Sequence, residues 1–216
     1  NNSYVVQVQV SDGTNTDTQT ITVSILDVNE FTPVITSDVG GSTASISNYA
    51  ENSTSAVTTV TSTDGDGSST ATYTIIGGTD ASDFTLGGSN GILTFNTTPN
   101  FESPHDSDAN NSYVVQVQVS DGTNTDTQTI TVTVIDVNEF TPVITSDVGG
   151  STASISNYAE NSTSAVTTVT STDGDGSSTA TYSISGTDVD DFTIDSSSGV
   201  LTFTSSPNFE VPTDSD

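Results

Sequence analysis

The sequence contains no Lys or Arg, whereas Asp and Glu together number 28, which gives a formal net charge of −28. A chain with this charge repels nucleic acids and anionic membrane surfaces. Enzymes that transfer phosphate hold their substrates with Lys or Arg, so the composition argues against kinases, GTPases and nucleases. We therefore expect no nucleic-acid partner and no direct membrane insertion.

Cysteine and tryptophan are absent as well, and His105 is the only histidine. Without Cys the chain has no disulfide, thiolate nucleophile or iron–sulfur cluster, and one His cannot build a His-based metal site. Oxygen atoms are therefore the abundant metal ligands. No apolar run reaches the roughly 18 residues of a membrane-spanning helix, and no stretch has the pattern of an export signal.

The apolar residues alternate with polar ones instead of clustering. Alternation runs through residues 4–11 and again through residues 21–25, which is the period of a half-buried β-strand. Between these stretches, residues 11–17 (Ser-Asp-Gly-Thr-Asn-Thr-Asp) are turn formers, so the segment predicts a β-hairpin. No segment shows a helical period with caps.

An internal repeat dominates the sequence. Residues 1–73 recur as residues 110–182 with only three mild substitutions, at an offset of 109. A repeat of this length with many short strands and turns is typical of an immunoglobulin-like β-sandwich. We therefore predict an all-β chain of tandem Greek-key sandwiches of about 109 residues each.

The phase of the repeat predicts the domain boundaries. Residues 1–28 would be the final hairpin of a preceding repeat, residues 29–137 a complete repeat, and residues 138–216 an incomplete repeat without its last two strands. An open sandwich exposes unpaired strands and is adhesive. Either the chain is a slice of a longer tandem array, or the hairpin of one molecule completes the last sandwich of the next. Both alternatives imply a fibre.

Acidic residues gather at the edges of the predicted domains. The heptapeptide Asp-Val-Asn-Glu-Phe-Thr-Pro occupies residues 27–33 and 136–142, and Thr-Asp-Gly-Asp-Gly turns occupy residues 63–67 and 172–176. Single acids follow Tyr-Ala, Pro-Asn-Phe or a valine-rich strand, at Glu51, Glu160, Glu102, Glu210, Asp12 and Asp121. In this order the motifs resemble the cadherin repeat, over the whole chain. The Ser/Thr-rich, Lys-free form is similar to cadherin-like repeats of large bacterial surface proteins.

The resemblance implies Ca²⁺ bound where two repeats meet, and Ca²⁺ prefers six to eight oxygen ligands. At the second junction the implied ligands are side chains and the carbonyls of Val137 and Phe140, in the set Glu51, Glu102, Asp136, Val137, Asn138, Glu139, Phe140, Asp173 and Asp175. At the first junction they are Asp27, Asn29, Glu30, Phe31, Asp64, Asp66 and Asp121. Asp12, Asn100, Glu160 and Glu210 stand at ligand positions of the same pattern.

The chain departs from the cadherin pattern at three kinds of position. Asn100 replaces an Asp of the family, Glu30 and Glu139 replace the second Asp of the linker, and Phe31 and Phe140 replace its Asn. A Phe is compatible with a site that uses only the carbonyl. The Asn removes a charge, so two ions for each junction are better supported than three.

These features favour a structural protein and not an enzyme: a calcium-stiffened repeat of an extracellular adhesin stalk or fibre. Its expected partners are neighbouring repeats or copies of itself, head to tail, together with a glycan or protein of a cell surface. The alternative is a carbohydrate-binding accessory module of a secreted protein. That module would need exposed aromatic side chains, whereas the alternation predicts core positions for Tyr4, Tyr73, Phe84 and Phe95.

Overall fold

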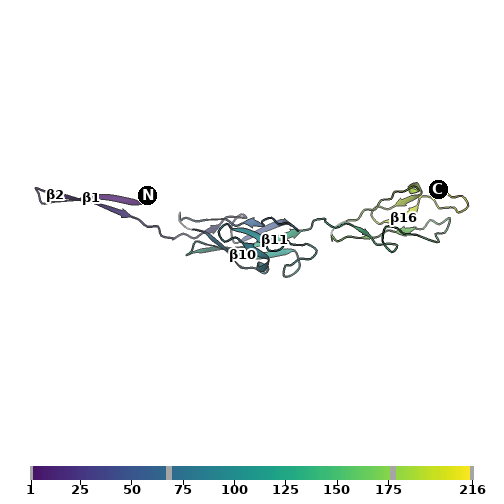
Figure 1. The fold of residues 1–216 in the computed structure, drawn as a ribbon, viewed down its shortest axis with the longest axis horizontal. Helices are drawn as coiled ribbons and strands as arrows, with labels where there is room; N and C mark the ends of the chain where they lie inside the picture. The colour runs from purple at the N-terminus through teal and green to yellow at the C-terminus, as the bar shows by residue number, and fades with distance from the viewer. Residues whose placement is uncertain (1, 67–69, 176–178, 215–216) are drawn as a thin grey trace. The chain divides into compact units, whose positions relative to one another are not determined.

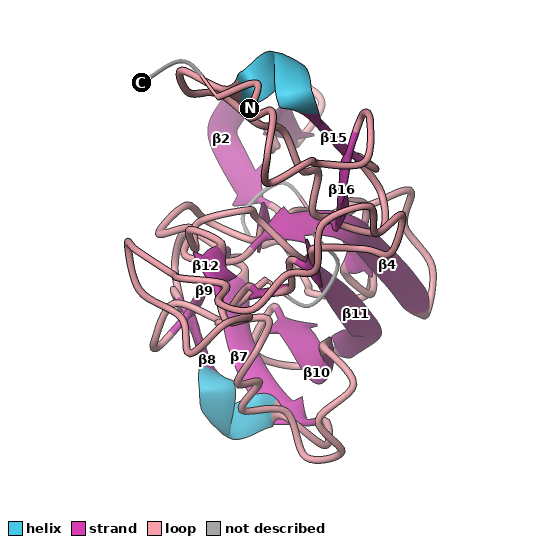
Figure 2. Ribbon diagram, turned by 90° about the vertical axis from the view of Figure 1, so that its right-hand side faces the viewer, coloured by secondary structure: helices cyan, strands magenta, loops and turns pink. Residues whose placement is uncertain are grey.

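The computed structural model describes residues 2–66, 70–175 and 179–214. It divides into two compact units, residues 1–100 with 104–135 and residues 101–103 with 136–216. Strands dominate both units, and the helical segments described are two 3₁₀ turns, η1 (Ala81–Asp83) and η2 (Val189–Asp191), the cyan segments of Figure 2. No helix in these ranges is long and apolar enough to cross a membrane. The predicted all-β class is confirmed.

Strands β1 (Ser3–Ser11) and β2 (Thr16–Ser24) form the predicted hairpin, drawn in purple in Figure 1. Their antiparallel register pairs Val6 with Ile21. Asp12 closes the turn, because its Oδ1 accepts the backbone N–H groups of Thr14 at 2.8 Å and Asn15 at 2.7 Å. Within the described chain, β1 and β2 pair only with each other and form a two-stranded sheet.

The first unit also contains a β-sandwich. One sheet has the order β4-β11-β10-β7, in which β11 runs parallel to β4 and antiparallel to β10. Figures 1 and 2 show β10 and β11 as neighbours. These strands span Thr43–Ala50 (β4), Thr125–Ile135 (β11), Ser112–Ser120 (β10) and Thr72–Gly77 (β7). Smaller sheets pair β3 (Val34–Ile35) with β6 (Ser62–Thr63), and β9 (Ile92–Phe95) with β5 (Thr58–Thr59) and β8 (Phe84–Leu86).

The core of this sandwich is built on β10 and β11. Every second side chain is buried along β10 and, in β11, from Gln128 to Val134, and Val115, Val117 and Val132 have no exposed surface. The Tyr113 ring packs edge-on against the rings of Phe84 and Phe95, which joins β10 to the smaller sheet. The hairpin of residues 112–135 therefore supplies the centre of the larger sheet and one face of the core.

Two buried polar groups fix this hairpin in the sandwich. The Asp80 carboxylate accepts the backbone N–H of Val114 at 2.8 Å and that of Ser107 at 2.7 Å. Burial acts to raise the pKa of Asp80, but these donors outweigh it and hold the pKa below its usual range. On β11 the fully buried Gln128 donates from Nε2 to the carbonyl of Gly41 at 3.1 Å.

The second unit repeats only the smaller sheets. Strand β12 (Val143–Ile144) pairs with β14 (Ser171–Thr172), and β16 (Val200–Phe203) pairs with β13 (Thr167–Thr168) and β15 (Phe192–Ile194). In the described part of this unit the four-stranded sheet has no counterpart. Residues 152–159 have the same sequence as β4 but form no strand, since no described strand of this unit pairs with them as β11 pairs with β4.

Equivalent residues of the two copies differ in burial for the same reason. Ile35 is 1% exposed, whereas its counterpart Ile144 is 52% exposed. Tyr113 is 1% exposed, whereas Tyr4 is 64% exposed. The prediction that Tyr4 lies in a core is therefore wrong, because β1 and β2 pair only with each other in the described chain. The same prediction is confirmed for Tyr73 and Phe84, which are 8% and 5% exposed.

Candidate calcium sites

In the first unit, the linker segment holds the Asp-Gly-Asp turn in place. The backbone N–H of Phe31 donates to Oδ2 of Asp66 at 2.8 Å, and the N–H of Asp66 donates to Oδ1 of Asp64 at 2.9 Å. Asp66 is only 8% exposed, and Oδ2 of Asp64 is buried without a hydrogen-bond partner. A buried carboxylate oxygen in this position is the kind of ligand that a divalent cation takes. Gly67, which closes the predicted motif, lies outside the described residues.

The Phe31 ring explains why the turn contains glycine. A Cβ atom on Gly65 would lie 2.5 Å from Cγ of Phe31, and one on Gly174 would lie 2.3 Å from Cγ of Phe140. Both distances are far below van der Waals contact. The linker Phe therefore packs on the turn while its N–H binds the second Asp. No sequence motif revealed this contact, since the Phe and the glycine lie about 34 residues apart in the chain.

The turn of the β10–β11 hairpin reaches the same linker. Asn124 donates from Nδ2 to the carbonyl of Phe31 at 2.8 Å. Asn29 lies beside Asp66 and Asp121: one atom of its amide is 3.3 Å from Oδ2 of Asp66 and 3.0 Å from Oδ2 of Asp121. In the amide orientation that places nitrogen here, Asn29 donates hydrogen bonds to both carboxylates. In the orientation that places oxygen here, the side chain adds a third oxygen ligand for a cation. The backbone N–H groups of Asn124 and Thr123 lower the pKa of Asp121, which keeps it ionised.

The second unit repeats the linker geometry. Asp175 accepts the N–H of Phe140 at 3.0 Å and that of Glu139 at 3.3 Å, and Asp173 accepts the N–H of Asp175 at 3.1 Å. Asp136, Glu139 and Asp175 each place a carboxylate oxygen within 4.8 Å of the others. Asp175 is 3% exposed. Gly176, which follows it, is outside the described residues.

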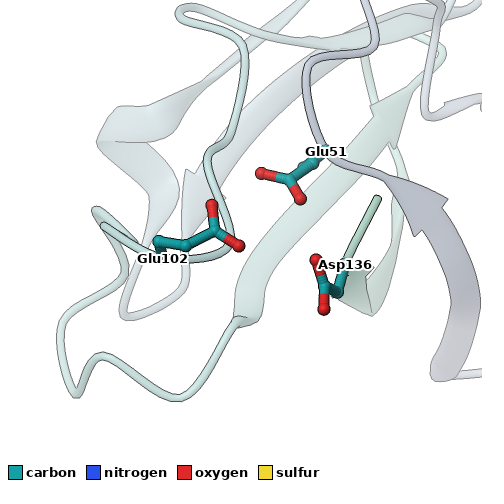
Figure 3. Close-up of side chains that lie close together, drawn as sticks. All are labelled: Glu51, Glu102 and Asp136. Carbon is teal, nitrogen blue, oxygen red and sulfur yellow. The ribbon is translucent and has the colours of Figure 1, made fainter. Parts of the chain in front are cut away.

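A further group contains Glu51, Glu102 and Asp136, whose carboxylate oxygens also lie within 4.8 Å of one another. Figure 3 shows the three side chains turned toward a common point. Glu51 directly follows β4 and is 3% exposed, and Asp136 directly follows β11. The Glu51 N–H donates to the carbonyl of Ile135 at 3.1 Å, which keeps the ends of these strands together.

Sequence comparison identifies no relatives, since no protein-family model and no curated protein matches this chain. Solved structures do match. Human CDH23 EC21-23 has a TM-score of 0.66 at 20% identity, over 97% of this chain and 66% of that one. The protocadherin gammaB7 EC3-6 cis-dimer has a TM-score of 0.66 at 19% identity, over 97% of this chain and 52% of that one. Mouse cadherin-23 EC22-24 has a TM-score of 0.55 at 18% identity, over 97% of this chain and 65% of that one.

The fold is that of cadherin extracellular repeats. The resemblance that the linker and turn motifs predicted is therefore confirmed for the fold. The chain spans about half the length of some protocadherin structures, at 52% for gammaB7 EC3-6 and 53% for Gamma B2 domains 3-6. Function and the ligands of individual residues are not part of this likeness, because the identities are all low.

The structure brings some of the predicted ligands close together and does not bring others into such a group. Seven acids, Glu51, Asp64, Asp66, Glu102, Asp136, Glu139 and Asp175, lie in the arrangements above, with Asn29, Phe31, Phe140, Asp121 and Asp173 beside them. Among the described residues, no group of three acids with oxygens within 4.8 Å of one another includes Asp12, Asp27, Glu30, Asp64, Asp66, Asp121, Glu160, Asp173 or Glu210. Glu160 instead accepts the N–H of Phe209, and Glu210 donates its N–H to Asn208. The ligand roles of all these residues, and those of Asn100, Val137 and Asn138, stay predictions.

The donor set fits Ca²⁺. Each cluster combines three carboxylates whose oxygens lie within 4.8 Å of one another, and carboxylate oxygens are ligands that Ca²⁺ accepts. Unit charges about 4 Å apart repel by roughly 4 kcal/mol at an effective dielectric near 20. The chain has no Lys or Arg to offset this repulsion. A bound divalent cation is therefore the available source of positive charge for these groups.

Proposed function

We propose that this protein is a structural repeat of an extracellular adhesion protein or fibre, stiffened by Ca²⁺ at its linkers. The observation that carries the proposal is the convergence of Asp136, Glu139 and Asp175 within 4.8 Å in a chain that has no basic side chain. In the proposed sites, Ca²⁺ would supply charge neutralisation and bridge linker to turn. The residues of the chain position the ligands, since the N–H groups of Glu139 and Phe140 orient the Asp175 carboxylate before any ion arrives.

The finer parts of the proposal follow from the sequence. The Ser/Thr-rich, Lys-free composition supports a bacterial surface protein, and millimolar extracellular Ca²⁺ suits the weak affinity expected of such modules. The near-identical repeats support a spacer that joins neighbouring repeats or copies of itself, head to tail, and that presents a tip to a cell-surface glycan or protein. The domain boundaries at residues 28 and 137 belong to this proposal.

Comparing the protein in Ca²⁺ with the protein in chelator tests the proposed calcium sites. In millimolar Ca²⁺ the melting temperature should rise by several degrees above that in chelator, because a ligand at 100 times its Kd adds about 2.7 kcal/mol to the free energy of unfolding. X-ray scattering should show a larger maximum dimension with Ca²⁺. Mg²⁺ serves as the matched ion, since it demands six tight octahedral ligands and keeps its water.

The variant Asp175→Asn should lose most of the Ca²⁺-dependent rise in melting temperature, whereas Asp190→Asn, which changes an exposed acid of the same unit, should keep it. An unchanged melting temperature and maximum dimension at saturating Ca²⁺ would contradict the proposal. Glycan binding that persists in chelator would instead favour the carbohydrate-binding module.

A further inference from the structure

The chain carries the same hairpin twice in two environments. Residues 3–24 and residues 112–133 have nearly the same sequence, and the register of β1 with β2 equals that of β10 with β11, residue by residue. The second hairpin is buried in the first sandwich. On the first hairpin, six of the corresponding apolar side chains are 40–67% exposed, namely Tyr4, Val6, Val8, Val10, Ile21 and Val23. An exposed apolar surface of this kind marks an interaction site.

The second unit presents the matching surface. In the first unit β11 pairs with β4 and β10 pairs with β7, so the hairpin fills the space between those two strands. The segments that correspond to β4 and β7 are present in the second unit, at residues 152–159 and from residue 181 onward, and neither forms a strand. Side chains that the hairpin covers in the first unit are exposed here: Ala44 is 8% exposed, while Ala153 is exposed, and Ile155 is 43% exposed.

The polar groups that fix the hairpin in the first unit also have counterparts. Oδ2 of Asp126 accepts the N–H of Ile35 at 2.8 Å, and the corresponding residues are Asp17 and Ile144. The buried bond from Gln128 to the Gly41 carbonyl corresponds to Gln19 and Gly150, and the bond from the Val114 N–H to Asp80 corresponds to Val5 and Asp188. At each of these positions, the first hairpin and the second unit therefore carry the same donor and acceptor groups that bond to each other in the first unit.

We propose that the hairpin β1–β2 of one copy inserts into the second unit of another copy and completes its sandwich. This inference rests on the proposed function and names its self-association surface. In the complex, Thr22 pairs with Ser154 as Thr131 pairs with Ser45. Asp17 binds the Ile144 N–H and Gln19 the Gly150 carbonyl. This is strand addition by a preformed hairpin, in which main-chain bonds give affinity and alternate side chains give specificity.

A second copy suits this role better than the hairpin of the same chain. In the first unit the linker after the hairpin is bound at the start of β11, where Asn124 holds the Phe31 carbonyl. The chain leaves that unit at the other end of β11, after Ile135. Because β11 has 11 residues, these two points are about 35 Å apart at the usual rise of a strand. The chain's own hairpin would have to fold back over that distance.

Insertion also adds ligands to the calcium site of the second unit. In the first unit the hairpin turn places Asp121 next to Asn29, whose amide also lies 3.3 Å from Asp66, and Asn124 on the Phe31 carbonyl. The corresponding residues of the inserted hairpin are Asp12 and Asn15, which would reach Asn138 and the Phe140 carbonyl. Asp12 already has the local geometry of Asp121, with its Oδ1 bonded to the same two N–H groups. The site at Asp136, Glu139 and Asp175 is therefore completed by the partner copy.

The absence of cysteine makes the register testable by disulfide trapping. Thr22→Cys and Ser154→Cys are placed in separate copies of the 216-residue chain, which are mixed in Ca²⁺ and oxidised. We expect these two variants to form a crosslinked heterodimer, because strand partners that are docked meet the geometry of a disulfide. In the control, Ser197→Cys replaces Ser154→Cys, and the yield of heterodimer should be lower by about ten-fold or more. Ser197 is an exposed residue at the tip between β15 and β16. The double variant Ser45→Cys/Thr131→Cys, made from a printed strand pair, is the positive control and should close within one chain.

The outcomes separate the two proposals. Background yield for the Thr22/Ser154 pair, with the positive control closed, would overturn hairpin insertion. The Ca²⁺-dependent melting temperature of the same samples reports on the calcium sites independently. With Asp12→Asn in the Thr22→Cys protein, the Ca²⁺ concentration for half-maximal crosslinking should rise several-fold, whereas Asp190→Asn in the Ser154→Cys protein should leave it unchanged. An unchanged requirement with Asp12→Asn would overturn the shared calcium site.

Discussion

Phe31 and Phe140 show how a single residue can adapt a linker. Each ring lies on the glycine between two aspartates, while its backbone N–H holds the second aspartate. The cadherin pattern has Asn at this position, with a side chain too small to cover the turn in this way. Both rings stay about half exposed, at 52% for Phe31 and 46% for Phe140, so each covers its glycine without entering the core.

The contact between Phe31 and Gly65 leads to a prediction. Gly65→Ala should lower the free energy of unfolding by about 1–3 kcal/mol, the usual range for overpacking, because the new Cβ would overlap the ring. Urea unfolding of the full chain in Ca²⁺ measures this. Gly88→Ala is the matched control, since its Cβ would meet its nearest atom at an ordinary 3.6 Å. The double variant with Phe31→Ala should recover part of the loss; equal losses in the single and double variants would contradict the overlap.

At the scale of elements, strand formation in this chain depends on partners more than on local sequence. The octapeptide Thr-Ala-Ser-Ile-Ser-Asn-Tyr-Ala is β4 in the first unit and forms no strand at residues 152–159. Its intrinsic β propensity is the same in both places, so only the neighbouring strand differs. Propensity measured in sheets likewise reflects packing against neighbours.

The two hairpins allow the same side chain to be tested in two environments. Val117 on β10 has no exposed surface, and its counterpart Val8 on β1 is 49% exposed. In dilute protein, Val117→Ala should lower the free energy of unfolding of the first sandwich by roughly 2–4 kcal/mol, because it leaves a cavity. Val8→Ala should change it by less than about 0.5 kcal/mol. Denaturant unfolding followed by tyrosine fluorescence measures both, and similar losses would mean that both hairpins are packed in dilute solution.

Much of the fold was predictable because alternation and turn residues are local signals. The hairpin of residues 3–24 and the pairing of Tyr113 with the core follow directly from period two and the repeat. The exposure of Tyr4 was not predictable from alternation, because a strand shows which face is apolar and not what covers it. Of the site, the Asp-Gly-Asp turns and Asp136 could be located by motif, whereas the Phe31 ring on Gly65 is a tertiary contact that no motif contained.

At the scale of the whole molecule, the dominant property is charge of one sign. With a formal net charge of −28 and no Lys or Arg, nearly all long-range electrostatic terms are repulsive and oppose compact structure. Added salt usually weakens ion pairs as well as repulsion, but here there are almost no pairs to weaken. The direction of the salt effect is therefore unambiguous.

In chelator, raising NaCl from about 10 mM to about 500 mM should increase the melting temperature by several degrees, since the Debye length falls from about 30 Å to below 10 Å. In saturating Ca²⁺ the same change should have a much smaller effect, because bound ions have already neutralised the acid clusters. Scanning calorimetry at both conditions measures this. A melting temperature that falls with salt in chelator would show that repulsion does not limit stability.

The shared register of the two hairpins has a consequence for any filament built from this chain. A junction closed by residues 112–133 within one polypeptide and a junction closed by residues 3–24 from another molecule would have the same strand pairing. The distance between successive sandwiches along the filament is then set by the repeat itself, whichever molecule supplies the hairpin. One very long polypeptide and a polymer of short ones would therefore have the same spacing of repeats along the filament. A gene could then be lengthened or divided during evolution without a change in that spacing.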